Sequence, residues 1–104
     1  MLDDPESDDA VAERCKRLRI VMEYAQSSAF AKFLGVSPQR WNNVEIGMPL
    51  SRDLAMTLVR KIPGLTLDWL YRDRSEGLPL DFARRLDALA PSNIKQHVSS
   101  RRPR

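Results

Sequence analysis

A short polar segment near the middle of the chain carries the side chains best suited to binding chemistry. Within seven residues it presents one hydroxyl, three carboxamides and one guanidinium, on Ser37, Gln39, Arg40, Asn42 and Asn43. A carboxamide donates and accepts hydrogen bonds at once, which matches the edge of adenine, and a guanidinium matches guanine or a phosphate. The segment therefore has the side chains that read base pairs.

The competing interpretation is that these polar groups only keep a surface helix soluble. Asn42 and Asn43 argue against it, because adjacent asparagines are poor helix formers and an unconstrained surface would favour Glu, Lys or Ala. We therefore expect the five polar side chains to face bases.

The residues before this segment predict a short helix and a tight turn. Its apolar side chains share one helical face and are expected to be buried: Phe30, Ala31 and Leu34. The hydroxyl of Ser27 or Ser28 can cap the helix start by accepting a free backbone N–H. Gly35 can end the helix, because a left-handed exit costs a glycine almost nothing, and Val36 then fills the turn.

A second helix is predicted to begin at Ser37, a hydroxyl cap followed by the proline favoured at the first helical position. Trp41 and Val44 lie three residues apart and face inward, which leaves the amides outside. Ala31 stands four residues before Gly35, where a small side chain lets two helices cross closely. Together these features predict a helix-turn-helix.

The segment FAKFLGVSPQRWNNVEIG resembles the helix-turn-helix of phage repressor and Cro proteins, the XRE-type family of bacterial transcription regulators. The later GLTLDWLYRD is similar to the closing helix of the same domain, and the two matches span about residues 14–74. The resemblance implies a five-helix DNA-binding domain in which Gln39 and Asn43 touch bases. It also implies a structural ion pair between Glu45 and a basic residue of the first helix, for which we choose Arg19.

Phosphate contacts are expected at the edges of the same surface. The family usually has a phosphate-binding side chain at the start of its second helix, where Ser27 and Ser28 stand, and Arg52 begins the helix that follows. Since one recognition helix reads only a few base pairs, we expect a homodimer on near-palindromic double-stranded DNA. The expected role is transcriptional repression by excluding polymerase from a promoter.

The whole chain is predicted to be all-α, with a five-helix domain and an additional C-terminal helix. We divide it into an acidic flexible leader at 1–8, the helix-turn-helix domain at 9–74, an amphipathic helix at 75–90 and a basic mobile tail at 91–104. Residues 1–13 hold six acids and no base, whereas residues 14–104 hold 17 basic against 8 acidic side chains, a formal balance of +9. A basic body fits a polyanionic partner.

The two outer helices are predicted from their apolar stripes. The first runs from Asp8 or Asp9 to about Ala25, with Cys15 as a buried apolar residue. Asp81 is expected to cap the last helix, whose apolar stripe consists of Phe82, Leu86 and Leu89. We favour a dimer contact for this stripe over folding back, because five helices already close a core.

Several classes of protein are excluded by what the sequence lacks. No apolar run approaches a membrane span, and the acidic N-terminus is unlike a signal peptide, so we expect a cytoplasmic protein without membrane contact. One cysteine and one histidine are too few for a zinc site, and no catalytic constellation or phosphate loop is present, so we expect no metal, no cofactor and no enzymatic activity. The alternative function is an antitoxin-like module that binds a protein partner through residues 75–104 and represses its own operon.

Overall fold

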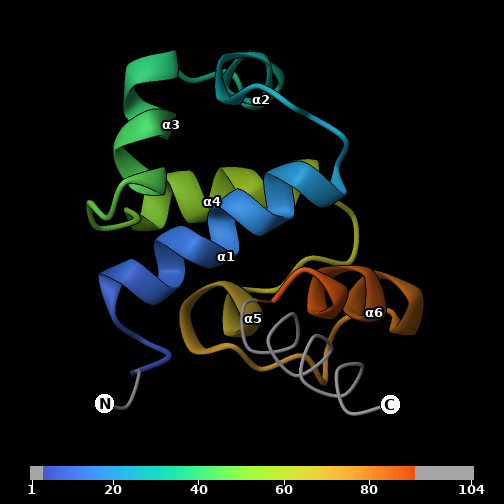
Figure 1. The fold of residues 1–104 in the computed structure, drawn as a ribbon. Helices are drawn as coiled ribbons and strands as arrows, with labels where there is room; N and C mark the ends of the chain where they lie inside the picture. The colour runs from blue at the N-terminus through green and yellow to red at the C-terminus, as the bar shows by residue number, and fades with distance from the viewer. Residues whose placement is uncertain (1–3, 91–104) are drawn as a thin grey trace, which may run out of the picture.

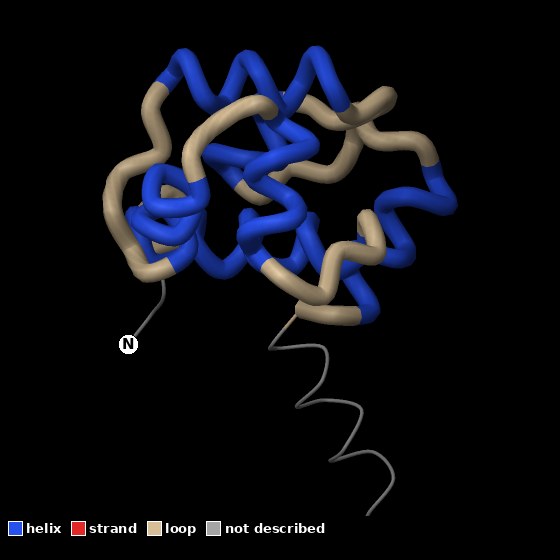
Figure 2. The backbone as a smooth tube through the Cα atoms, turned by 90° about the horizontal axis from the view of Figure 1, so that it is seen from above, coloured by secondary structure: helices blue, strands red, loops and turns tan. Residues whose placement is uncertain are grey.

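The computed structural model describes residues 4–90, and every regular element in that part of the chain is a helix (Figures 1 and 2). In chain order the helices are α1 (Asp8–Val21), α2 (Ser27–Leu34), α3 (Pro38–Glu45), α4 (Arg52–Lys61), α5 (Leu67–Arg72) and α6 (Leu80–Ala88). The predicted all-α class is confirmed. The tail predicted at 91–104 and the first three residues of the leader lie outside the described residues.

Helix α1 is the element that joins the two ends of the molecule. In Figure 1, α2 and α3 form one end, α1 and α4 cross the middle, and α5 and α6 form the other end. Helix α1 packs against α3, α5 and α6, while α2 packs against α3 and α4. The largest fully buried side chains form one core between these layers: Cys15, Leu18, Phe30, Trp41, Leu54, Leu58, Ile62, Leu70 and Leu86.

Three helices begin with a side-chain cap, and the cap at Ser37 confirms the prediction from sequence. The hydroxyl of Ser37 accepts from the Arg40 amide at 3.1 Å, that of Ser51 accepts from the Leu54 amide at 3.2 Å, and Thr66 caps α5 in the same way at 3.1 Å. These bonds satisfy amides that have no partner inside their own helix. They fix where α3 and α4 begin, which sets the direction of the polar segment.

Two other predicted caps are wrong. Helix α2 already begins at Ser27, so Ser27 and Ser28 are helical, and Gln26 holds the extended cap position without a side-chain hydrogen bond. Helix α6 begins at Leu80, which places Asp81 inside the first turn instead of before it. A cap acts only from a residue with non-helical backbone, and in both cases the residue at the cap position lies one or two residues before the predicted cap.

Helix α1 ends at Val21, four residues before the predicted end at Ala25. Glu23 adopts a left-handed conformation with φ of 70°, which stops the helix. Beyond it, one guanidinium nitrogen of Arg19 donates to the carbonyls of Tyr24 and Ala25, each at 2.8 Å. These bonds hold the connection to α2 in a non-helical path.

Helix α6 folds back on α1. Leu86 is fully buried, Phe82 and Leu89 are partly buried against the core, and Arg17 Nη1 donates to the Leu86 carbonyl at 3.2 Å. Arg85 Nη2 donates to the carbonyl of Val21 at 2.9 Å. The apolar stripe of α6 is therefore occupied within the chain, contrary to the dimer contact that we favoured from sequence.

Candidate nucleic-acid interface

The inner face of α2 and the turn after it form the base of the candidate interface. Phe30 and Ala31 are fully buried and Leu34 is nearly so, while Val36 is half-buried against the same core. Gly35 ends α2 with φ of 83° and donates its amide to the Ala31 carbonyl at 2.9 Å. A side chain at this φ would be strained, so glycine lets the chain reverse directly into α3.

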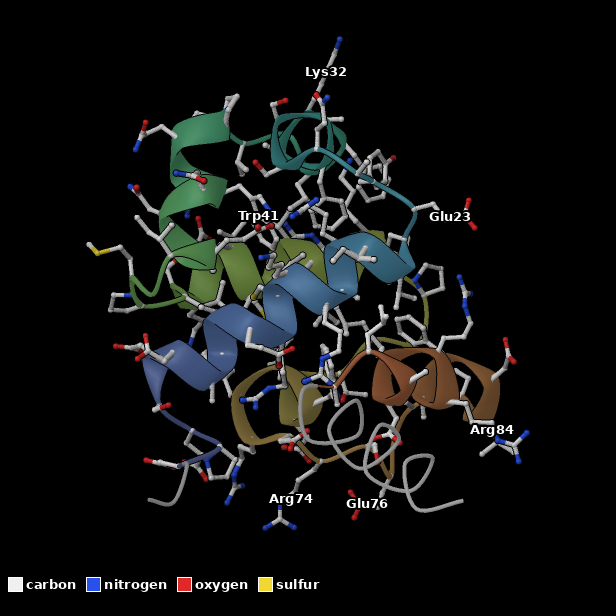
Figure 3. The ribbon with its side chains drawn as sticks, viewed as in Figure 1. Glu23, Lys32, Trp41, Arg74, Glu76 and Arg84 are labelled. Atoms are coloured by element: carbon white, nitrogen blue, oxygen red, sulfur yellow. The ribbon has the colours of Figure 1, made fainter. Side chains whose placement is uncertain are left out.

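The inner face of α3 is anchored by Trp41 and Val44, which are 0 % and 4 % exposed. In Figure 3 the side chain of Trp41 lies in the interior, whereas Lys32 on α2 projects outward. The Trp41 ring meets that of Phe30 edge to face, with centroids 5.0 Å apart. Helix α3 therefore has one rigidly held face, and its opposite face is fixed in direction.

Glu45, the last residue of α3, is bound by α1. Arg19 Nε donates to Glu45 Oε2 at 2.7 Å and Arg19 Nη2 donates to Oε1 at 3.2 Å, with both side chains 8 % exposed. Trp41 Nε1 also donates to Glu45. Such a two-pronged pair has more directional preference than a single contact, so it fixes α3 relative to α1. Neither charge is left for a ligand.

The outer face of α3 carries the predicted base-reading side chains. Gln39, Arg40 and Asn42 are exposed, and Asn43 is half-buried. Gln39 Nε2 donates to Asn43 Oδ1 at 2.9 Å, so the two amides are linked on the surface. Ser37 lies at the start of this face, with its oxygen occupied as the helix cap.

Arg40 leans away from the amides towards α4. Its Nη2 donates to the hydroxyl of Ser51 at 3.2 Å, and Ser51 is followed by the exposed Arg52 at the first position of α4. The structure thus brings Arg40 and the start of α4 together. This geometry suits a phosphate better than a base, because the guanidinium is tied to the helix start and not to the amide face.

The other predicted phosphate contacts lie on a separate helix. Ser27 is half-buried and Ser28 is exposed in the first turn of α2, whose amides receive no side-chain cap. Uncapped amides at a helix start favour anions. Ser27 and Ser28 are thus not part of the α3 surface, but stand at a helix start of suitable polarity.

Two exposed apolar residues next to this surface were missed in the sequence reasoning. Ile46 caps the C-terminal end of α3 and is 69 % exposed, and Met48 follows it at 54 %. Ile46 stands three residues after Asn43, and this helical spacing was the signal that could have placed it on the outer face.

Comparison of the chain with models of known protein families, with curated proteins and with solved structures finds no match. Within residues 4–90, no three acidic, histidine or cysteine side chains gather where they could hold a metal ion. No helix in the same range has the length and apolar character needed to cross a bilayer.

Proposed function

We propose that this protein is a sequence-specific DNA-binding transcriptional regulator of the XRE-type helix-turn-helix class, with α3 as its recognition helix. The observation that carries the proposal is the division of α3 into two faces. Trp41 and Glu45 are locked into the domain, while Gln39, Asn42 and Asn43 form an uncharged amide surface directed outward. Groups that read base edges need this combination of rigid support and free hydrogen-bonding capacity.

An α-helix fits the major groove of B-DNA, where each base pair shows a distinct pattern of donors and acceptors. Amide side chains match adenine, and one good pairing contributes about 1–3 kcal/mol of discrimination against a wrong base. Gln39 and Asn43 lie one helical turn apart and so address neighbouring base pairs. Arg40 is assigned mainly to the phosphate backbone of the DNA, because its guanidinium is hydrogen-bonded to Ser51 at the start of α4.

Phosphate contacts would fix the register of the helix in the groove. Arg52 and the uncapped first turn of α2, including Ser28, are the groups that support this role. They add affinity that weakens with salt and carries no sequence information.

The regulator acts as a symmetric dimer in this proposal. The eight residues of α3 span about 12 Å, which covers only a few base pairs. Two copies would place their recognition helices about 34 Å apart on a near-palindromic operator. Occupation of that operator excludes polymerase, so repression is the expected outcome.

The test is a binding selection from random DNA duplexes with three proteins: the wild type, the double variant Gln39→Ala/Asn43→Ala, and Arg84→Ala. Arg84 projects from α6 at the other end of the molecule and serves as the control (Figure 3). We expect wild type and Arg84→Ala to enrich the same near-palindrome and the double variant to lose it. Circular dichroism should show unchanged helix content, since alanine is the best helix former.

Sequence-blind binding by the wild type would overturn the proposal. The antitoxin-like alternative would then be tested with a search for a protein partner of residues 75–104. That alternative has lost one of its supports, because the apolar stripe of α6 is buried against α1.

A further inference from the structure

The loop that follows α3 exposes an apolar pair beside the amide face. Ile46 is 69 % exposed and Met48 is 54 % exposed, and the loop residues 46–50 carry no charge. A single exposed apolar side chain is ordinary in a soluble protein. Two within three residues, at the end of the helix that presents the amides, call for a partner with apolar character.

Ile46 belongs to the same stripe as the amides. At 3.6 residues per turn, it is displaced by about 20° around the helix axis from Gln39, seven residues earlier. Its amide donates to the Asn42 carbonyl at 3.1 Å, and its φ of −97° and ψ of 5° keep it close to the path of the last turn. The side chain therefore continues the outer face of α3 and does not belong to a separate loop surface.

The loop is held so that this pair faces outward. Met48 donates its amide to the Asn43 carbonyl at 3.0 Å, which closes the end of the helix. Gly47 has φ of 113°, and a Cβ added there would lie 2.9 Å from a carboxylate oxygen of Asp9 on α1. The close carboxylate disfavours a phosphate at the loop, since it would repel one. A neutral apolar group remains the suitable partner.

We infer that Ile46, with Met48 beside it, contacts the C5-methyl group of a thymine at one end of the half-site read by Gln39 and Asn43. This inference rests on the proposed function. The thymine methyl is the apolar group that base pairs display in the major groove, and apolar side chains read it by contact. The loop thus adds a thymine preference that the amides alone do not supply.

The experiment uses the operator obtained by selection. Each thymine of one half-site is replaced in turn by deoxyuridine, which removes only the methyl group. Affinities are measured for the wild type, Ile46→Ala, Met48→Ala and Leu80→Ala. Leu80 lies on α6 and is 67 % exposed, so it matches Ile46 in exposure and apolar character but lies at the opposite end of the fold.

We expect one deoxyuridine replacement to weaken wild-type binding about fourfold, the effect of one buried methyl group. The same replacement should have no effect on Ile46→Ala, a reduced effect on Met48→Ala and its full effect on Leu80→Ala. If each deoxyuridine replacement weakens binding equally in wild type and in Ile46→Ala, the inference is overturned while the proposed function stands. If no operator is selected at all, the proposed function fails and the inference fails with it.

A second copy of the chain is the rival partner for Ile46 and Met48. Sedimentation of wild type and Ile46→Ala measures their oligomeric state and so distinguishes this partner from a thymine methyl group. A variant that loses dimers while keeping the wild-type thymine dependence would assign the pair to the dimer contact and overturn the inference. Unchanged sedimentation together with lost thymine dependence supports it.

Discussion

Gln39 and Asn43 are joined by a hydrogen bond of 2.9 Å across one turn of α3, from Gln39 Nε2 to Asn43 Oδ1. The bond uses one donor of Gln39 and one lone pair of Asn43. The carbonyl oxygen of Gln39 and both N–H groups of Asn43 stay available for a partner. The amide face therefore presents a linked pair with a set direction, and not two independently rotating side chains.

The first prediction is that Gln39 and Asn43 act as a unit in DNA binding. Gln39→Ala and Asn43→Ala should each weaken binding to the selected operator by about 1–3 kcal/mol. The double variant should lose less than the sum, with a coupling of about 1 kcal/mol, because either single change already breaks the link. Titration of labelled operator with wild type, the two single variants and the double variant gives the four affinities of the double-mutant cycle. Strict additivity would show that the two amides act separately.

The second prediction concerns the buried ion pair between Arg19 and Glu45. Arg19→Met should lower the free energy of unfolding by about 3–5 kcal/mol, because it leaves the Glu45 charge buried without its partner. Urea denaturation measures the loss, and Arg19→Met/Glu45→Met should recover part of it. The exposed pair of Arg72 and Glu6, 3.4 Å apart, is the control, and Arg72→Ala should cost less than about 1 kcal/mol.

The third prediction concerns salt. Arg52→Ala should reduce the slope of log affinity against log salt concentration by about one, because one phosphate contact is lost. The preferred operator should stay the same. Arg84→Ala removes an equal exposed charge from α6 and should leave the slope unchanged. An equal effect of both variants on the slope would mean that only net charge matters. It would contradict the phosphate contact proposed for Arg52.

Much of the α2–α3 unit could be predicted from sequence, because its signals are local. Gly35 needs a left-handed φ, and Ser37 with the following proline marks a helix start, so turn and helix could be placed from a few residues. The caps of α2 and α6 were misplaced because several residues in a row could begin a helix. The end of α1 was missed because Arg19, which is paired with Glu45 of α3, donates to the Tyr24 and Ala25 carbonyls, and an apolar stripe does not reveal such contacts.

The packing of α6 could also not be predicted from the sequence. Its apolar stripe is equally compatible with a dimer contact and with folding back. Contacts with α1 determine that it folds back. The Arg17 side chain on α1 donates to the Leu86 carbonyl, and the Arg85 side chain on α6 donates to the Val21 carbonyl. At the candidate interface, the sequence placed the amides on the outer face of α3, but Ile46 was not considered, because only the polar residues of this segment were weighed.

The fourth prediction concerns Cys15, the single cysteine, which is fully buried in the core. Burial, with a smaller effect of the Glu45 charge, raises the pKa of its thiol from 9.0 to about 12. At pH 8 the native thiol should therefore not react with a thiol reagent, and the reaction should begin only as denaturant unfolds the chain. Rapid labelling of the native protein would contradict the burial of α1 against the core.

The same pKa shift sets a dependence of stability on pH. A thiol whose pKa is raised in the native state contributes stability that is fully present below pH 9.0 and is lost as pH rises towards 12. Between pH 8 and 11, the free energy of unfolding should fall more steeply for wild type than for Cys15→Ala. The pKa of Tyr71 is raised by burial and, to a smaller extent, by the charge of Cys15. The burial effect is present in both proteins and cancels in the comparison, whereas the effect of Cys15 on Tyr71 belongs to the difference that is measured. Parallel curves would show that the native thiol ionises as readily as the unfolded one.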